Sequence, residues 1–100
     1  MAENHSMAYV YSFKKKIKDE EIEYLILWAL KNAEIYYGNA RVRLEFSYLI
    51  KDSKCIIRGG SEVSDYIARI FTGLLIQRLG EENFKVEQVT KKEVPDKKQV

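Results

Sequence analysis

The stretch from residue 22 to residue 39 reads IEYLILWALKNAEIYYGN and has no Gly or Pro before Gly38. It predicts a helix that begins near Asp19 and that Gly38 and Asn39 end. At 100° per residue, one face carries Ile22, Leu25, Ile26, Ala29, Ala33 and Tyr36, and the opposite face carries Tyr24, Leu27, Trp28 and Ile35, with Lys31 among them. A surface helix normally buries one such stripe. The second stripe therefore needs a cover, and we expect another protein chain to supply it.

Length and composition predict one small domain with a core. The chain has 100 residues, of which 46% are hydrophobic and 32% charged, with a net charge of +2. A domain this short buries only about two-thirds of its unfolded surface, so oligomerisation would help it. We expect a disordered start (1–6), one α+β domain (7–89) and a charged tail (90–100). The start lacks the apolar core of a signal peptide, and no apolar run reaches the length of a membrane span, so a cytoplasmic protein is expected.

Alternating residues predict strands on either side of the first helix. In residues 8–13, Tyr9, Tyr11 and Phe13 share one face, which is typical of a half-buried strand. Residues 40–50 read as the clearest strand of the chain. Its apolar face would hold Val42, Leu44, Phe46, Tyr48 and Ile50, and its polar face Arg41, Arg43, Glu45 and Ser47. A turn at 51–54 and a short strand at 55–58 would complete a hairpin.

A second helix and a last strand follow the hairpin. Ser61 can cap the helix, as Asp19 can cap the first one, and Gly80 ends it. Its core stripe would be Val63, Tyr66, Ile67, Ile70, Phe71 and Leu74, which leaves Leu75, Ile76 and Leu79 as surplus apolar residues. Residues 84–89 suit a strand, although their pairing stays open. The order is that of a ferredoxin-like β-α-β-β-α-(β) fold, an antiparallel sheet with two helices on one face.

Catalytic signals are nearly absent from the sequence. The only histidine, His5, lies in the polar start, and no CxxC or HExxH pattern is present. We therefore expect no catalytic residue, metal site or cofactor, and no enzyme. The single cysteine, Cys55, lies in an apolar run and is interpreted as a small buried hydrophobe. The acidic cluster from Asp19 to Glu23 is explained by capping and by compensation of the helix dipole.

RNA binding is a second hypothesis, because RNA-recognition motifs share this topology. Those modules stack bases on aromatic residues of the exposed sheet face. Tyr9, Tyr11 and Phe13 match the core face instead, and the strand at 55–58 has no aromatic residue, so a stacking platform is not expected. A basic strip could still contact phosphates. Its candidate RNA-contacting residues are Lys14, Lys15, Lys16, Arg41 and Arg43.

Protein association is the strongest functional signal in the sequence. The candidate interface residues are Tyr24, Leu27, Trp28, Ile35, Leu75, Ile76 and Leu79. Large exposed apolar patches mark interfaces, and Trp and Tyr are favoured anchors there. The alternative is that the second helix or the tail covers this patch within the monomer. We expect a homodimer, or a heterodimer with a related small subunit.

The stretches DEEIEYLILWALKNAEIYY, ARVRLEFSYLIKDSKCIIR and SEVSDYIARIF together resemble the small dimer-forming subunit of KEOPS, a complex that takes part in threonylcarbamoylation of tRNA adenosine. The resemblance covers roughly residues 9–79 and rests on pattern and spacing. It implies a non-catalytic scaffolding subunit of a tRNA-modifying assembly. Ile67 stands where that family tends to have an arginine, and the nearest arginine is Arg69. This departure suggests a diverged paralogue that keeps the pairing surface.

The hairpin ending in IIR, followed by a helix and FKVEQV, also resembles the small RNA-recognition-like protein subunits of RNase P. That resemblance implies an RNA-binding subunit as the alternative function, with tRNA as a candidate partner.

Overall fold

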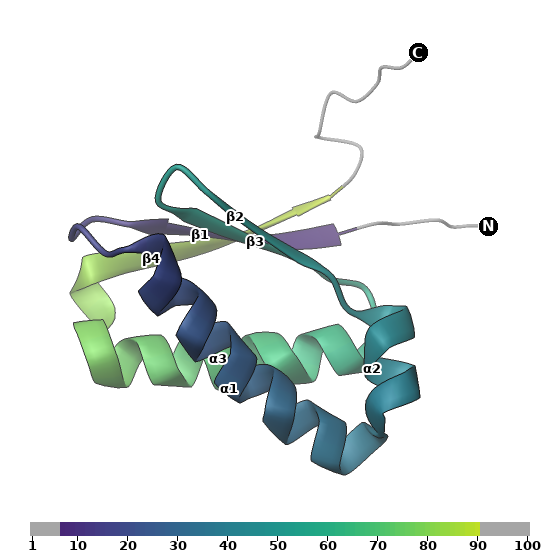
Figure 1. Ribbon diagram of the computed structural model, residues 1–100. Coiled ribbons are helices and arrows are strands. Elements are labelled where there is room, and N and C mark those ends of the chain that lie inside the picture. Colours follow the sequence, from purple (N-terminus) through teal and green to yellow (C-terminus); the bar gives the residue numbers. More distant parts are fainter. Residues whose placement is uncertain (1–6, 91–100) are drawn as a thin grey trace.

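A four-stranded antiparallel sheet forms one layer of the fold, and helices lie against one of its faces (Figure 1). The computed structural model describes residues 7–90. The strands are β1 (Met7–Phe13), β2 (Tyr48–Lys51), β3 (Lys54–Arg58) and β4 (Phe84–Thr90), and the helices are α1 (Asp19–Tyr37), α2 (Asn39–Glu45), α3 (Glu62–Leu79) and the short 3-10 helix η1 (Glu81–Asn83). The strand order is β2-β3-β1-β4. The predicted α+β class is confirmed, and the last strand pairs, but α2 is an addition to the predicted ferredoxin-like order.

Alternation along β1 decides which face of the sheet meets the helices. Tyr9 lies opposite Ile57 and Tyr11 lies opposite Cys55 in the β1–β3 register. Tyr11, Cys55 and Ile57 are wholly buried. Successive side chains of a strand point to opposite faces. The aromatic residues of β1 therefore face the helices, as the sequence predicts, and Val10 and Ser12 lie on the outer face of the sheet.

The helix α2 replaces most of the strand that the sequence predicts at 40–50. Only its last residues, from Tyr48, form a strand. Val42 is buried as expected, but Leu44 is 85% exposed and does not face the core. The segment NARVRLE is rich in residues that favour helices, and the Arg41 Nε donates to the Glu45 carboxylate at 3.0 Å across one helical turn. Apolar residues two apart suited both structures, so alternation alone gave the wrong element.

The turn between β2 and β3 is the one that the sequence predicts. Lys51 pairs with Lys54, so Asp52 and Ser53 are the two loop residues. Both have positive φ angles, 53° and 60°. Two consecutive left-handed residues are the signature of a type I′ turn, whose twist matches that of the flanking strands. The hairpin is thus confirmed, with a shorter first strand.

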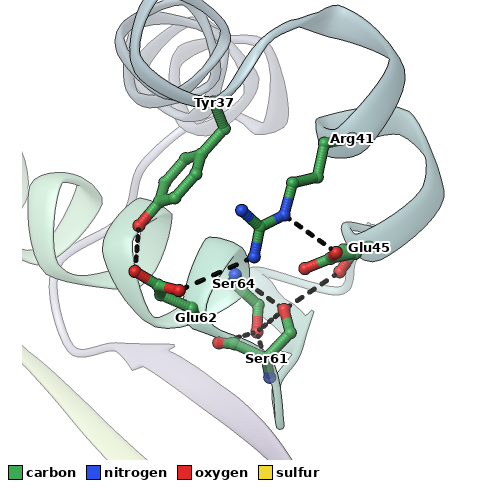
Figure 2. A network of polar contacts seen from close by, with 6 residues as sticks. All are labelled: Tyr37, Arg41, Glu45, Ser61, Glu62 and Ser64. Carbon is green, nitrogen blue, oxygen red and sulfur yellow. Dashed lines mark hydrogen bonds and ion pairs between the residues drawn. The ribbon is translucent and has the colours of Figure 1, made fainter.

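The helix ends follow the capping residues, with one correction. Ser61 is the N-cap of α3, where its hydroxyl accepts a hydrogen bond from the Ser64 N–H and the Ser64 hydroxyl accepts one from the Ser61 N–H (Figure 2). Gly38 has a φ of 94° and ends α1 after Tyr37. Asp19, however, is already the first helical residue, and the N-cap is Lys18, without a side-chain bond. The Asp19 carboxylate therefore serves the helix dipole and not the cap.

The core lies between the sheet and the two long helices. Its wholly buried large side chains include Tyr11, Ile22, Ile26, Ile57, Ile67, Phe71 and Leu75. The rings of Tyr11 and Phe71 meet edge to face, with centroids 4.9 Å apart. This core fixes α1 and α3 on the sheet, and it leaves the apolar outer face of α1 exposed.

Candidate protein-binding surfaces

The outer face of α1 is apolar and exposed. Tyr24 is 57% exposed, Leu27 43%, Trp28 54% and Ile35 85%. These four residues, called the α1 patch below, lie opposite the side of the helix that carries the buried residues Ile22, Leu25, Ile26, Ala29 and Ala33. Within the part of the chain that the structure describes, neither α3 nor any strand covers them. The predicted surplus of apolar helix surface is therefore present at α1.

Charged residues border the α1 patch. The first turn of α1 carries Asp19, Glu20 and Glu21, whereas its last turn has no basic residue. Lys31 lies on the patch side and forms a 4.0 Å ion pair with Glu34. A partner that covers this patch would therefore meet the acidic side chains of the first turn at one end of the helix.

The three apolar residues of α3 that the sequence assigns to the interface do not join the α1 patch. Leu75 is wholly buried in the monomer core, so its assignment to an exposed surface is wrong. Leu79 is partly buried against the same core. Ile76 is 42% exposed, but it lines a groove beside β4. The flank of α3 that faces α1 is marked instead by Arg78, which lies 2.6 Å from the Glu21 carboxylate.

The groove beside β4 is a second candidate surface, which sequence reasoning missed. It has a volume of about 510 Å³ and runs between α3 and the last strand. Its apolar part is formed by Tyr11, Gly73, Ile76 and Val86, and its polar rim includes Asp65, Arg69 and Gln88. The Tyr9 hydroxyl donates to the Asp65 carboxylate at 2.6 Å at one end. The groove depends on the pairing of β4 beside β1, which the sequence pattern alone does not determine.

The five basic residues proposed to contact RNA lie at opposite ends of the molecule. Lys14, at the end of β1, donates its backbone N–H to the Asn83 carbonyl, beside the end of α3. Arg41 lies on α2, 3.6 Å from Glu62 at the start of α3 (Figure 2). The 18 residues of α3 separate these ends by about 27 Å. Arg41 and Arg43 are thus not strand residues beside Lys14–Lys16, and the expected strip is not continuous.

A different basic cluster emerges from the strand register. Lys51 pairs with Lys54 across the hairpin, and Ser12 pairs with both Lys54 and Lys85. Partners in register share a face, so the three lysines form a row across the outer face of the sheet. Lys14, Lys15 and Lys16 are exposed and follow directly at the same end of β1. Knowledge of the register is needed to find this row, because Lys85 is distant in the sequence from Lys51 and Lys54.

The titratable groups of the core are neutral at physiological pH. Burial raises the pKa of the Cys55 thiol to about 12, and burial likewise raises the pKa of Tyr11 to about 12. Cys55 is wholly buried, as the sequence predicts. Among residues 7–90, no group of three His, Cys, Asp or Glu side chains could hold a metal ion.

No helix among the described residues has the length and apolarity to cross a membrane. Comparisons of the chain with models of protein families, with curated proteins and with solved structures gave no match.

Proposed function

We propose that the protein is a non-catalytic subunit that binds another protein chain through the α1 patch. The observation that carries this proposal is the exposure of Tyr24, Leu27 and Trp28 on one face of a helix whose opposite face fills the core. Exposed contiguous apolar surface mostly marks an interaction site, and aromatic residues near its centre supply much of the binding energy. The surface would otherwise be a liability in solution.

The pattern of the α1 patch suits a partner helix. Its residues recur at intervals of three, one and seven along α1, as expected for a ridge that packs against a second helix. The acidic first turn of α1 favours a partner with basic residues at that end. A second α1 in antiparallel orientation offers little such charge, because the last turn of α1 has no basic residue. We therefore expect a different chain at this surface.

A tRNA-modifying assembly of the KEOPS type is the context we propose for this partner. The support is the sequence resemblance over residues 9–79, together with a sheet and two long helices in the order that the resemblance requires. Because α2 occupies residues 39–45, the long hairpin of the resembling family is shortened here. Pairing in this chain would therefore rely on its helices and on its last strand. The role would be to hold larger subunits in place.

The experiment compares full-length tagged chains purified from the native host. Trp28→Glu places a charge at the centre of the α1 patch, and Leu44→Glu places the same charge on an exposed apolar residue of α2, outside the patch. Wild type and Leu44→Glu should retain one stoichiometric partner, identified by mass spectrometry, and Trp28→Glu should lose it. Equal recovery with all three chains, or no stoichiometric partner with any, would reject the proposal.

The tRNA context has its own readout. Nucleoside analysis of total tRNA from a host that lacks the gene should show reduced threonylcarbamoyl adenosine. That level should be restored by wild type and by Leu44→Glu but not by Trp28→Glu. An unchanged level of threonylcarbamoyl adenosine in the host that lacks the gene would reject the role in tRNA modification, while the proposed protein binding would be unaffected by that result.

Direct RNA contact is a second candidate, favoured by the lysine row of Lys51, Lys54 and Lys85. Titration of tRNA at several salt concentrations tests it. Replacing Lys51 and Lys54 by Gln should weaken binding and reduce the salt slope by about one per lysine. The control replaces Arg41 and Arg43 by Gln. These residues lie on α2, near the other end of α3, so the salt slope should be unchanged. An unaltered slope for the lysine variant would dismiss RNA contact at this row.

A further inference from the structure

Among residues 7–90, no strand pairs with the outer side of the β4 backbone. β4 lies at the end of the sheet order and pairs only with β1, through seven consecutive register pairs from Met7–Thr90 to Phe13–Phe84. The pairing is continuous, so no bulge bends the strand, and β4 contains no proline. Edge strands of soluble proteins are usually short, bulged, or covered by another element. A long regular edge of this kind is a template for another strand.

Side chains of β4 alternate between the helix side and the outer face of the sheet. Phe84, Val86 and Gln88 pair in register with Phe13, Tyr11 and Tyr9, so they lie on the helix side. Lys85 and Glu87 lie on the outer face, where the Lys85 ammonium is 3.4 Å from the Glu87 carboxylate. The outer face of this edge thus carries one positive and one negative charge, two residues apart.

We propose that a second copy of this chain pairs antiparallel along β4, with Val86 opposite the partner's Val86. In this register Lys85 lies opposite the partner's Glu87, and Glu87 lies opposite the partner's Lys85. The two-fold axis makes both ion pairs equivalent, as in an isologous dimer. The proposal is independent of what binds the α1 patch, because β4 and α1 present different surfaces.

Charge selects this register over its neighbours. A shift that centres the pair on Lys85 places Lys85 opposite the partner's Lys85, and a shift that centres it on Glu87 places Glu87 opposite the partner's Glu87. Like charges directly opposite each other destabilise a strand pair. Centring the pair between two residues would turn one copy over, so that helix-side residues of one would face outer-side residues of the other. Only the pairing centred on Val86 matches both charge and face.

The same register places the second copy at the border of the groove beside β4. Val86 is 39% exposed and Ile76 is 42% exposed along this groove. With the two-fold axis at Val86, both copies keep their helices on the same side of the joined sheet. Each groove then lies next to the partner's groove, and the two Val86 side chains meet across the axis. The second copy therefore covers apolar surface that the monomer leaves in water.

The experiment measures the mass of the full chain by sedimentation equilibrium at micromolar concentrations. Wild type should be a dimer. Lys85→Glu gives a strand edge with two negative charges and Glu87→Lys one with two positive charges, so each variant alone should dimerise at least about tenfold more weakly. An equimolar mixture of these two variants should form a heterodimer, and the chain with both replacements, which exchanges the charges, should dimerise like wild type.

Two further chains keep the result interpretable. Circular dichroism of each single variant should match wild type, because both positions are exposed. Trp28→Glu should dimerise like wild type. A monomeric wild-type chain, undiminished dimers of the single variants, or no rescue in the mixture would overturn the proposal. Loss of the dimer in Trp28→Glu would also overturn it, since association would then depend on α1.

Discussion

The hydroxyl oxygen of Tyr11 lies 2.8 Å from the hydroxyl oxygen of Thr72, and this contact ties the central strand to the middle of α3. The one proton of the Tyr11 hydroxyl is shared between the Thr72 oxygen and the Ala68 carbonyl, which lies 3.2 Å from the Tyr11 oxygen. Both partners keep other bonds, since the Thr72 hydroxyl donates to the same carbonyl at 2.7 Å. Tyr11 therefore acts mainly through its buried ring, and its hydroxyl orients α3.

Tyr11→Phe should lower the free energy of unfolding by only about 1 kcal/mol, because the groups it leaves behind remain hydrogen-bonded. Tyr11→Ala should lower it by about 3–5 kcal/mol, because it removes a ring from a filled core. Urea unfolding followed by circular dichroism measures both values. Equal losses for the two variants would assign the stability to the hydroxyl and not to the ring.

Stability should fall in alkaline solution, from about pH 9 upward. Burial raises the pKa of Cys55 from 9.0 to about 12 and the pKa of Tyr11 from 10.0 to about 12. Both groups are neutral in the folded state at pH values where the unfolded chain already ionises. Their stabilisation is complete below the unfolded pKa values and is lost as the pH rises toward 12.

Urea midpoints measured from pH 8 to pH 11 test this dependence. Cys55→Ala should be less stable at pH 8, because it leaves a cavity, but its decline should begin about one pH unit later than that of wild type. An identical onset in wild type and in Cys55→Ala would show that the thiol does not contribute to the alkaline loss.

Ser61→Ala should destabilise the protein by about 1 kcal/mol. The replacement removes the oxygen that accepts the Ser64 N–H at 3.0 Å and leaves the first turn of α3 without its cap. Ser61→Asp is the matched control, because a carboxylate oxygen can accept the same bond. Thermal unfolding should place Ser61→Asp near wild type, and an equal loss in both variants would show that the cap itself is not the source.

Gly73→Ala should stabilise the monomer by about 0.5–1 kcal/mol, since Gly weakens the interior of a helix. A Cβ atom at Gly73 would meet nothing within 4 Å. The same is true at Gly38, but its φ of 94° strains any side chain, so Gly38→Ala should destabilise. Urea unfolding of the two variants should give opposite signs. A loss at Gly73 would mean that the groove needs the missing side chain.

Much of the fold followed from periodicity and capping. The spacing of the α1 stripe predicts a core face, and the structure buries five of its residues, Ile22, Leu25, Ile26, Ala29 and Ala33, whereas Tyr36 is 69% exposed. Gly38, Ser61 and Gly80 marked helix ends because only a few residue types satisfy the backbone there. Residues 39–45 were misassigned because the alternation Val42, Leu44 fits a strand, while the ion pair from Arg41 to Glu45 that favours a helix is a contact one turn apart.

The surfaces were harder to predict than the core. Exposure of Trp28 could be inferred, since one helix cannot bury two opposite stripes in a small domain. The burial of Leu75 could not, because it depends on how α3 is rotated on the sheet. The lysine row and the β4 groove depend on strand register, which joins Lys51 and Lys85 through residues far away in the chain.

At the opposite margin of the sheet, β2 spans only four residues. So short an edge strand offers few backbone hydrogen-bonding groups to another strand. The positive charge of Lys51 also repels the lysines of a second β2–β3 hairpin. The joined sheet of two chains paired along β4 would therefore have a short β2 strand at each outer edge. Assembly would therefore stop at the dimer. The dimer would have one continuous eight-stranded sheet that does not extend into a fibre.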